Sequence, residues 1–164
     1  MTLLIRAIVG RADDERFASR RRDVLGVGSE EALRRRLRGV TADGTGVALD
    51  LPRGSFLHGG AVIHDDGERI IVVERSPEPA LVVRLADSRS AEELLAQAVR
   101  VGHWAGNQHL LVETVGREIR VRIATTPELM LRSAQALALG GADISLSSLP
   151  FAREQPPSRA HSHE

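Results

Sequence analysis

The stretch SAEELLAQAVRVGHWAGNQHLLVETV, residues 90–115, combines the strongest helix signal of the chain with the start of an apolar strand. Ser90 is followed three residues later by Glu93, the pattern of a capping box, in which each side chain bonds the backbone N–H of the other residue. Apolar residues then recur at helical spacing. We expect the apolar face of this helix to consist of Leu94, Leu95, Ala98 and Val99.

Two of the chain's six histidines lie at the end of this helix. His109 follows a Gly106–Asn107 corner and begins the apolar stretch HLLVETV, so we predict that it starts a strand, exposed and geometrically fixed, at a sheet edge or end. His103 lies in the last helical turn, where the helix dipole favours a protonated imidazole or a hydrogen bond to a free carbonyl group. That position predicts helix capping as its role.

The rest of the second half alternates between strand-like and helix-like patterns. A second helix is predicted within TPELMLRSAQALALGG, with a cap at Thr126, Pro127 at the first helical position and two glycines at the exit. Strands are predicted at residues 80–86, 109–115, 118–123 and 142–149. The resulting order β-α-β-β-α-β is the split pattern of a ferredoxin-like sandwich.

The first half has the pattern of short strands joined by turns. LRRRLRGV and VALDL flank an Asp43-Gly44 turn, and AVIH and RIIVVE flank an HDDGE turn, so both pairs predict hairpins. TLLIRAIVG, residues 2–10, predicts one strand. Within GSEEALRRRL, residues 28–37, the basic alternation favours a strand over a turn of helix.

The segment SPEP, residues 76–79, separates these two halves and predicts a linker. We therefore expect an α+β protein with a β-rich N-terminal domain over residues 1–75 and a ferredoxin-like βαββαβ domain over residues 76–150. Residues 151–164 are rich in proline, serine and charge, which predicts a disordered tail.

The composition excludes several classes of function. Lys and Arg number 22 and so do Asp and Glu, so no net field attracts nucleic acid or an acidic membrane. The absence of cysteine leaves imidazole, carboxylate and backbone groups as the available metal ligands. The motifs GxSxG, HExxH, the P-loop and the dinucleotide-binding glycine pattern are also absent, so we expect no enzyme.

Targeting signals and nucleic-acid signals are likewise missing. The N-terminal apolar run is interrupted by Arg6 and is too short for a signal peptide, and no segment is long enough to span a bilayer. Three Phe and one Trp offer little stacking surface for RNA. We expect a soluble cytoplasmic protein that contacts neither membrane nor nucleic acid.

The remaining histidines divide into two pairs. His58 and His64 lie beside turns, where a polar surface residue or a hydrogen-bonded filler is the expected role. His161 and His163 form the tail sequence HSH, which places two imidazoles on one side of an extended chain, where they can hold nickel, copper or zinc. A disordered end without metal explains the tail pair equally well.

Several motifs together resemble a known family. RRRLRGVTADGTGVALDLPRGSFLHGGAVIHDDGERIIVV, residues 34–73, followed by GNQH at residues 106–109 and a histidine-bearing tail, is similar to the UreE family of urease accessory proteins. The resemblance covers nearly the whole chain, in order. It implies a nickel metallochaperone for urease maturation, with an N-terminal domain for partner contacts and a ferredoxin-like metal-binding domain.

The same resemblance implies a metal site. The family's ligand falls on His109, contributed by both chains of a homodimer, and a residue near a two-fold axis does meet its own copy. His161, His163 and His103 are further candidates. The implied cargo is Ni(II), with Zn(II) or Cu(II) as competitors in vitro. The implied partners are the urease apoprotein and the urease accessory GTPase complex.

An alternative from another class is a protein-interaction module without metal. In that case the ferredoxin-like domain binds a protein or a small ligand, and the arginine-rich segments Arg20–Arg22 and Arg34–Arg36 contact acidic partners. The same arginines also fit a solvated strand face that nearby acids balance. A nickel titration with the dimer mass measured alongside distinguishes the two functions.

Overall fold

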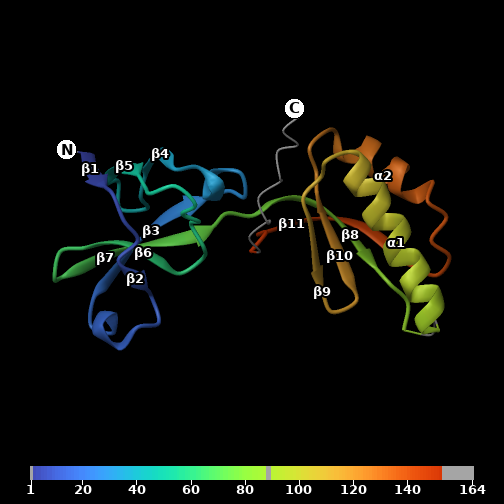
Figure 1. Cartoon of the computed structure of the whole chain (residues 1–164), viewed down its shortest axis with the longest axis horizontal. Helices are drawn as coiled ribbons and strands as arrows, with labels where there is room; N and C mark the ends of the chain where they lie inside the picture. Colours follow the sequence, from blue (N-terminus) through green and yellow to red (C-terminus); the bar gives the residue numbers. More distant parts are fainter. Residues whose placement is uncertain (1, 88–89, 153–164) are drawn as a thin grey trace, which may run out of the picture. The chain divides into compact units, whose positions relative to one another are not determined.

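A computed structural model of the chain describes residues 2–87 and 90–152, which form two compact units (Figure 1). The first unit runs to Ser76 and also includes Ala152, and the second is Pro77–Phe151. No helix within the described ranges is long and apolar enough to cross a membrane. The predicted tail from residue 153 onward, with His161 and His163, lies outside the described residues.

The first unit is built from two β-sheets. Its strands are β1 (Thr2–Ile5), β2 (Gly10–Arg11), β3 (Arg21–Val27), β4 (Arg36–Val40), β5 (Gly46–Asp50), β6 (Ala61–Asp65) and β7 (Arg69–Arg75). One sheet has the order β1-β5-β4 and the other β2-β6-β7-β3. Buried residues of both sheets, among them Leu49 and Ile71, form one hydrophobic cluster, so the sheets enclose a shared core.

Both predicted hairpins are present. β4 pairs antiparallel with β5 across the Asp43-Gly44 turn, and β6 pairs antiparallel with β7. Gly44 and Gly67, one in each turn, have φ values of +85° and +93°, which glycine adopts without steric cost. The pairings of β1 with β5 and of β3 with β7 are parallel.

Two predictions for the first half are wrong. TLLIRAIVG does not form one strand, because β1 ends at Ile5 and β2 begins at Gly10 in the other sheet. The chain therefore crosses between the sheets where a continuous strand was expected. Within GSEEALRRRL, residues Glu31–Leu33 form a 3-10 turn that buries Ala32, and strand β4 begins only at Arg36.

The second unit has the element order predicted for a ferredoxin-like domain. Its elements are β8 (Glu78–Arg84), α1 (Ala91–Asn107), β9 (Val112–Val115), β10 (Glu118–Arg122), α2 (Pro127–Gln135) and β11 (Asp143–Leu149). The sheet has the order β11-β8-β10-β9 with every pair antiparallel, and both helices cover one of its faces (Figure 1). The predicted α+β fold class is confirmed.

The capping box of α1 is confirmed. The backbone N–H of Glu93 donates to Oγ of Ser90 at 3.2 Å, and the backbone N–H of Ser90 donates to Oε2 of Glu93 at 3.0 Å. These bonds satisfy two backbone donors that the first helical turn otherwise leaves unpaired. The helix start is therefore set by local sequence alone.

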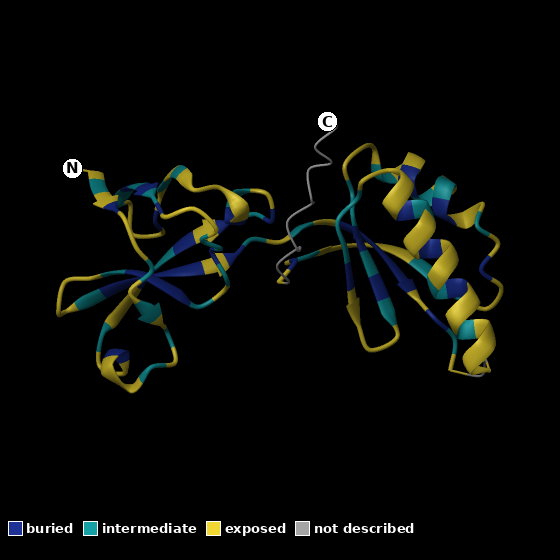
Figure 2. Ribbon diagram, in the orientation of Figure 1, coloured by how far each residue is buried: buried dark blue, intermediate teal, exposed yellow. Residues whose placement is uncertain are grey.

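The predicted packing face of α1 is wrong in part. Gln97, Val101 and Ala105 are buried, whereas Leu95 and Val99 are 66% and 60% exposed. Figure 2 shows the corresponding mixture of buried and exposed residues along α1. Apolar residues occupy two sides of this helix, and the sheet covers only the side that contains Val101 and Ala105. Leu95 and Val99 are consequently left facing away from the core.

Three details near the C-terminus also differ from expectation. Thr126 occupies the N-cap position of α2 but makes no side-chain capping bond, and the helix ends at Gln135, several residues before the predicted glycine exit. Ala138 has a positive φ of 51° in the turn that follows. Phe151, assigned to the tail from sequence, is 1% exposed and thus buried.

Candidate metal-binding site

His109 lies in the turn that ends α1. Its backbone N–H donates to the carbonyl oxygen of Gly106 at 3.0 Å, and the N–H of Leu110 donates to the carbonyl oxygen of Ala105 at 3.0 Å. These two bonds define a Schellman motif, in which the residue after the C-cap adopts a left-handed conformation. Gln108 is the C-cap, and His109 occupies the position usually held by glycine.

The predicted strand position of His109 is therefore wrong, because β9 begins only at Val112. His109 has a φ of +54°, a backbone region that costs an L residue roughly 1–2 kcal/mol. Its side chain is exposed, and no residue in the described ranges hydrogen-bonds either ring nitrogen. The turn therefore combines a left-handed backbone with an exposed imidazole that has no hydrogen-bond partner among the described residues.

The turn that carries His109 rests on a fixed scaffold. Ala105 is fully buried and Leu110 packs against the same hydrophobic cluster, which supplies the apolar contact that accompanies Schellman motifs. One turn earlier, Nε1 of Trp104 donates to Oγ of Ser133 at 2.9 Å and ties α1 to α2. The backbone of His109 is thus held by packing and hydrogen bonds, while its side chain stays accessible.

His103 does not cap the helix. Its Nε2 lies 3.0 Å from the amide Nδ2 of Asn107, one helical turn along. With the amide nitrogen as donor, the Nε2 lone pair of His103 is the acceptor in this contact. Coordination of a metal through Nε2 would break that bond, so His103 is a less available donor than His109.

His58 and His64 both belong to the first unit and are half-buried. Nδ1 of His58 lies 3.1 Å from the carbonyl oxygen of Gly59, and His64 is on β6 beside the turn that contains Asp66. Within residues 2–87 and 90–152, no three His, Asp or Glu side chains come together as a metal site. The described part of one chain therefore presents no three-donor site, and His161 and His163 lie outside the described residues.

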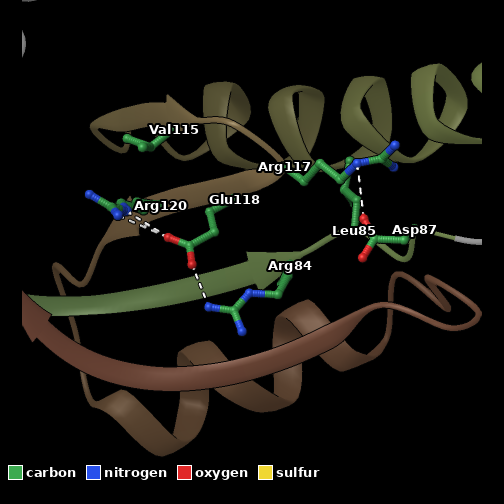
Figure 3. Close-up of a pocket in the computed structure, with 7 residues that line it drawn as sticks. All are labelled: Arg84, Leu85, Asp87, Val115, Arg117, Glu118 and Arg120. Carbon is green, nitrogen blue, oxygen red and sulfur yellow. Dashed lines mark hydrogen bonds and ion pairs between the residues drawn. The ribbon is translucent and has the colours of Figure 1, made fainter.

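A surface hollow of about 350 Å³ in the second unit holds a network of ion pairs (Figure 3). Glu118 accepts from Arg84 at 2.5 Å and from Arg120 at 2.9 Å, and these two hydrogen bonds, Arg84 first, hold the pKa of Glu118 below its ordinary value. Arg117 pairs with Asp87 at 3.1 Å. The charged groups of the hollow thus pair with one another, and no histidine is among the residues that line it.

Sequence reasoning missed one feature of this region, which is the exposed stripe that leads along α1 towards His109. Its members are Leu95, Val99, Gly102 and Gly106, which follow one another at intervals of three and four residues. A Cβ atom built on either glycine would meet nothing within 4 Å. The helical spacing of these two glycines with Leu95 and Val99 could have indicated a second face of the helix.

Known proteins resemble this chain. The profile of the family described as "UreE urease accessory protein, N-terminal domain" matches residues 5–75. The protein named Urease accessory protein UreE 1 from Pseudomonas syringae pv. syringae is 32% identical over 127 residues, which is 73% of this chain and 82% of that protein. Urease accessory protein UreE from Nostoc sp. is 32% identical over 136 residues, 82% of each chain. The protein of that name from Chelativorans sp. is 35% identical over 132 residues, 80% of this chain and 75% of its own length.

Proposed function

Because this chain belongs to the UreE family of urease accessory proteins, we propose that it is a metallochaperone that binds Ni(II) and delivers it for assembly of the urease active site. Its family consists of accessory proteins rather than enzymes, so the chain takes part in urease maturation and acts with the urease machinery. We infer that its direct partners are the urease apoprotein and the urease accessory GTPase complex.

The observation that carries the nickel proposal is the left-handed backbone of His109, whose φ is +54°. Glycine is the usual residue there, and a histidine in its place supports a role for the ring as a ligand. Imidazole is a good ligand for Ni(II). A ligand exposed on a turn can also be reached by a receiving protein, as cargo release requires.

A homodimer completes the proposed site. One imidazole per chain does not hold an ion firmly, and no cluster of three donors exists among the described residues. A two-fold axis near His109 would bring the same residue from each protomer to one ion. We therefore propose that His109 of both protomers forms the central ligand pair.

The exposed stripe of α1 supports dimerisation beside His109. Leu95 and Val99 leave apolar surface in solvent, which a second copy would cover. Gly102 and Gly106 each cost a helix about 1 kcal/mol relative to alanine, and the chain's own packing does not need them. Glycines allow close approach of another backbone, so the stripe fits a symmetric helix–helix contact.

Val99→Glu is expected to convert the dimer into a monomer and to weaken Ni(II) binding about tenfold or more, since a charge would be buried in the apolar contact. Glutamate is a good helix former, so the fold should persist. Light scattering and calorimetric titration measure the two effects. Leu129→Glu on α2, at a residue 55% exposed, is the matched control and should change neither. If the Val99→Glu variant still forms a dimer, the dimer interface lies elsewhere on the protein.

Removal of the tail after Pro157 is expected to weaken Ni(II) binding by roughly tenfold without preventing it. His161 and His163 would act as tethered ligands, which reach the ion at high effective concentration. The double variant His161→Ala/His163→Ala should reproduce the effect in a full-length chain. An unchanged isotherm in both proteins would show that the tail histidines do not coordinate the ion.

The test of nickel delivery is activation of urease apoprotein under a chelator that captures free Ni(II). Nickel-loaded protein should restore urease activity where the same amount of nickel salt does not. Cu(II) binds such donors more tightly than Ni(II), and Zn(II) competes, so both should bind in vitro without producing active urease. Equal activation by salt and by loaded protein would remove the case for delivery.

A non-metal interaction module remains the second candidate function. The observation that favours it is the number of exposed arginines in the first unit, which suit acidic partners. A protein that contacts urease machinery yet gives a flat Ni(II) titration would support this function over nickel carriage.

A further inference from the structure

A hollow of about 200 Å³ lies between α1 and the turn that follows α2 in the second unit. This turn comes after Gln135 and runs beside α1 (Figure 1). The hollow is separate from the one around Glu118, since the two share no lining residue among those that the structure describes. It is called the α1 pocket below, and its lining residues are Glu93, Ala96, Gln97, Arg100, Ala138 and Gly140.

Gln97 lines the α1 pocket, and only one end of its side-chain amide has a partner. The residue is 8% exposed, and its Nε2 donates to the carbonyl oxygen of Gly140 at 2.9 Å. That bond distinguishes the two ends of the amide, because only the nitrogen donates. Oε1 of Gln97 is buried and has no hydrogen-bond partner among the described residues. A buried acceptor without a partner costs free energy, so the pocket favours a ligand that carries an N–H or O–H group.

Two charged side chains of α1 lie on either side of Gln97. Glu93 precedes it by four residues and Arg100 follows it by three, so all three share one face of the helix. Oε2 of Glu93 accepts from the backbone N–H of Ser90 at 3.0 Å, which fixes its carboxylate in place. Arg100 is exposed and has no ion pair or hydrogen bond with any described residue. The pocket therefore presents a carboxylate, an unpartnered amide oxygen and a guanidinium group, in that order along α1.

The turn that forms the other wall has a strained backbone. Ala138 has a φ of +51°, a left-handed conformation that an L residue adopts against steric resistance. The next residue, Leu139, is buried in the hydrophobic cluster of the second unit and holds the turn in place. The turn in this conformation presents the carbonyl oxygen of Gly140 to Gln97. Strained residues persist where the surrounding structure holds them, and they are frequent at ligand sites.

We propose that the α1 pocket binds a small α-amino acid as its zwitterion. The ammonium group would donate to Oε1 of Gln97 on the side of Glu93, and the carboxylate would pair with the guanidinium group of Arg100. An α-amino acid carries its two charges one carbon atom apart, which suits neighbouring side chains of one helix face, whose Cβ atoms lie about 5–6 Å apart. None of these groups is a proposed nickel ligand, so amino-acid binding is independent of nickel carriage.

Size and charge distinguish an amino acid from other ligands. The volume of about 200 Å³ exceeds the roughly 10–15 Å³ that one water molecule needs and is below the roughly 300–1,000 Å³ of pockets for drug-sized ligands. A carboxylate without a donor group would pair with Arg100 but offers nothing to Oε1 of Gln97. An amine without a carboxylate would satisfy Oε1 but add a like charge beside Arg100. An α-amino acid meets both requirements.

The test is a titration of metal-free, isotope-labelled, full-length protein with L-alanine, propionate or propan-2-amine, which are a zwitterion and its two halves. Heteronuclear NMR follows the side-chain amide of Gln97 and the backbone amide of Gly140. L-Alanine should shift both signals to saturation, and each half should bind about tenfold more weakly or less. Propionate that binds as tightly as L-alanine would overturn the assignment in favour of an anion site. Unchanged signals with L-alanine would overturn it in favour of a pocket filled by water.

Substitutions of Arg100 test the role of the guanidinium group. Arg100→Gln should weaken L-alanine binding about tenfold or more, and Arg100→Lys should retain most of the affinity because it keeps the charge. The matched control is Arg132→Gln, at an exposed arginine of α2 that does not line the pocket. It should bind L-alanine as the unaltered protein does. Equal affinity in Arg100→Gln and Arg132→Gln would show that Arg100 does not hold the carboxylate and would overturn the assignment.

Gln97→Met tests the buried acceptor, since methionine fills similar space without an amide. It should bind L-alanine about tenfold more weakly or less, with circular dichroism to check the fold. If this variant does not fold, the exposed Arg100 still decides the question, because its substitution disturbs no buried group. All variants should keep the unaltered Ni(II) isotherm, so failure of amino-acid binding is distinguishable from failure of nickel carriage.

Discussion

Replacing His109 with glycine is expected to abolish high-affinity Ni(II) binding and at the same time to stabilise the fold. In a two-fold site one substitution removes an imidazole from each protomer, so affinity should fall by more than about 100-fold. Glycine adopts the φ of +54° without steric cost, which relieves roughly 1–2 kcal/mol. Its greater freedom in the unfolded chain offsets about 0.5–1 kcal/mol of that gain. A net stabilisation of between zero and about 1.5 kcal/mol remains.

Controls at other histidines make the result specific. His109→Ala should lose nickel in the same way but gain no stability, since alanine also resists the left-handed conformation. His58→Ala and His64→Ala should leave both the isotherm and the dimer unchanged. Calorimetric titration and urea denaturation of the four variants measure these effects. Full nickel affinity in His109→Gly would mean that the site lies on another residue.

Replacing Asp23 with alanine is expected to destabilise the first unit by about 3 kcal/mol. Asp23 is 1% exposed, and its carboxylate accepts from Oγ1 of Thr41 at 2.7 Å and from the N–H of Asp43 at 3.1 Å. It also lies 3.6 Å from Arg69. The TADGT turn is thereby fastened to β3, and alanine would leave buried donors without an acceptor.

The pH dependence of this unit should follow the same carboxylate. Burial acts most strongly on Asp23 and raises its pKa, but three hydrogen bonds and the charge of Arg69 together outweigh it, so the pKa lies below the ordinary value. A lowered pKa in the folded state means that Asp23 contributes stability above about pH 4, which is lost as the pH falls through the folded pKa.

Urea denaturation of full-length protein between neutral and acidic pH measures both effects. Asp23→Asn keeps one acceptor oxygen, so it should be destabilised less than Asp23→Ala and should lose less stability on acidification than the unaltered chain. The matched control is Asp13→Ala, since the Asp13 side chain is 75% exposed and Arg11 is its only ion-pair partner among the described residues. Identical denaturation curves for Asp23→Ala and Asp13→Ala would show that the buried network does not stabilise the turn.

The candidate site shows which features of His109 can be predicted from sequence patterns and which cannot. His109 could be singled out because it follows a corner and matches a family motif, yet its backbone conformation could not be predicted from the sequence. The pattern GNQH fits a strand start or a helix end, and the choice depends on Leu110 packing beside Ala105 in the core. The Schellman motif, and with it the strain at His109, exists only when that packing forms.

Local signals determined the order of elements in the second unit, because a capping box, turn glycines and hydrophobic periodicity act among neighbouring residues. The two hairpins of the first unit were determined in the same way. The tertiary structure alone decided which side of α1 is buried, since Val99 and Val101 are equally apolar and only the sheet distinguishes them. It also decided the contact between Asp23 and Thr41, which local sequence does not encode because the two residues meet only when β3 and the β4–β5 hairpin pack together.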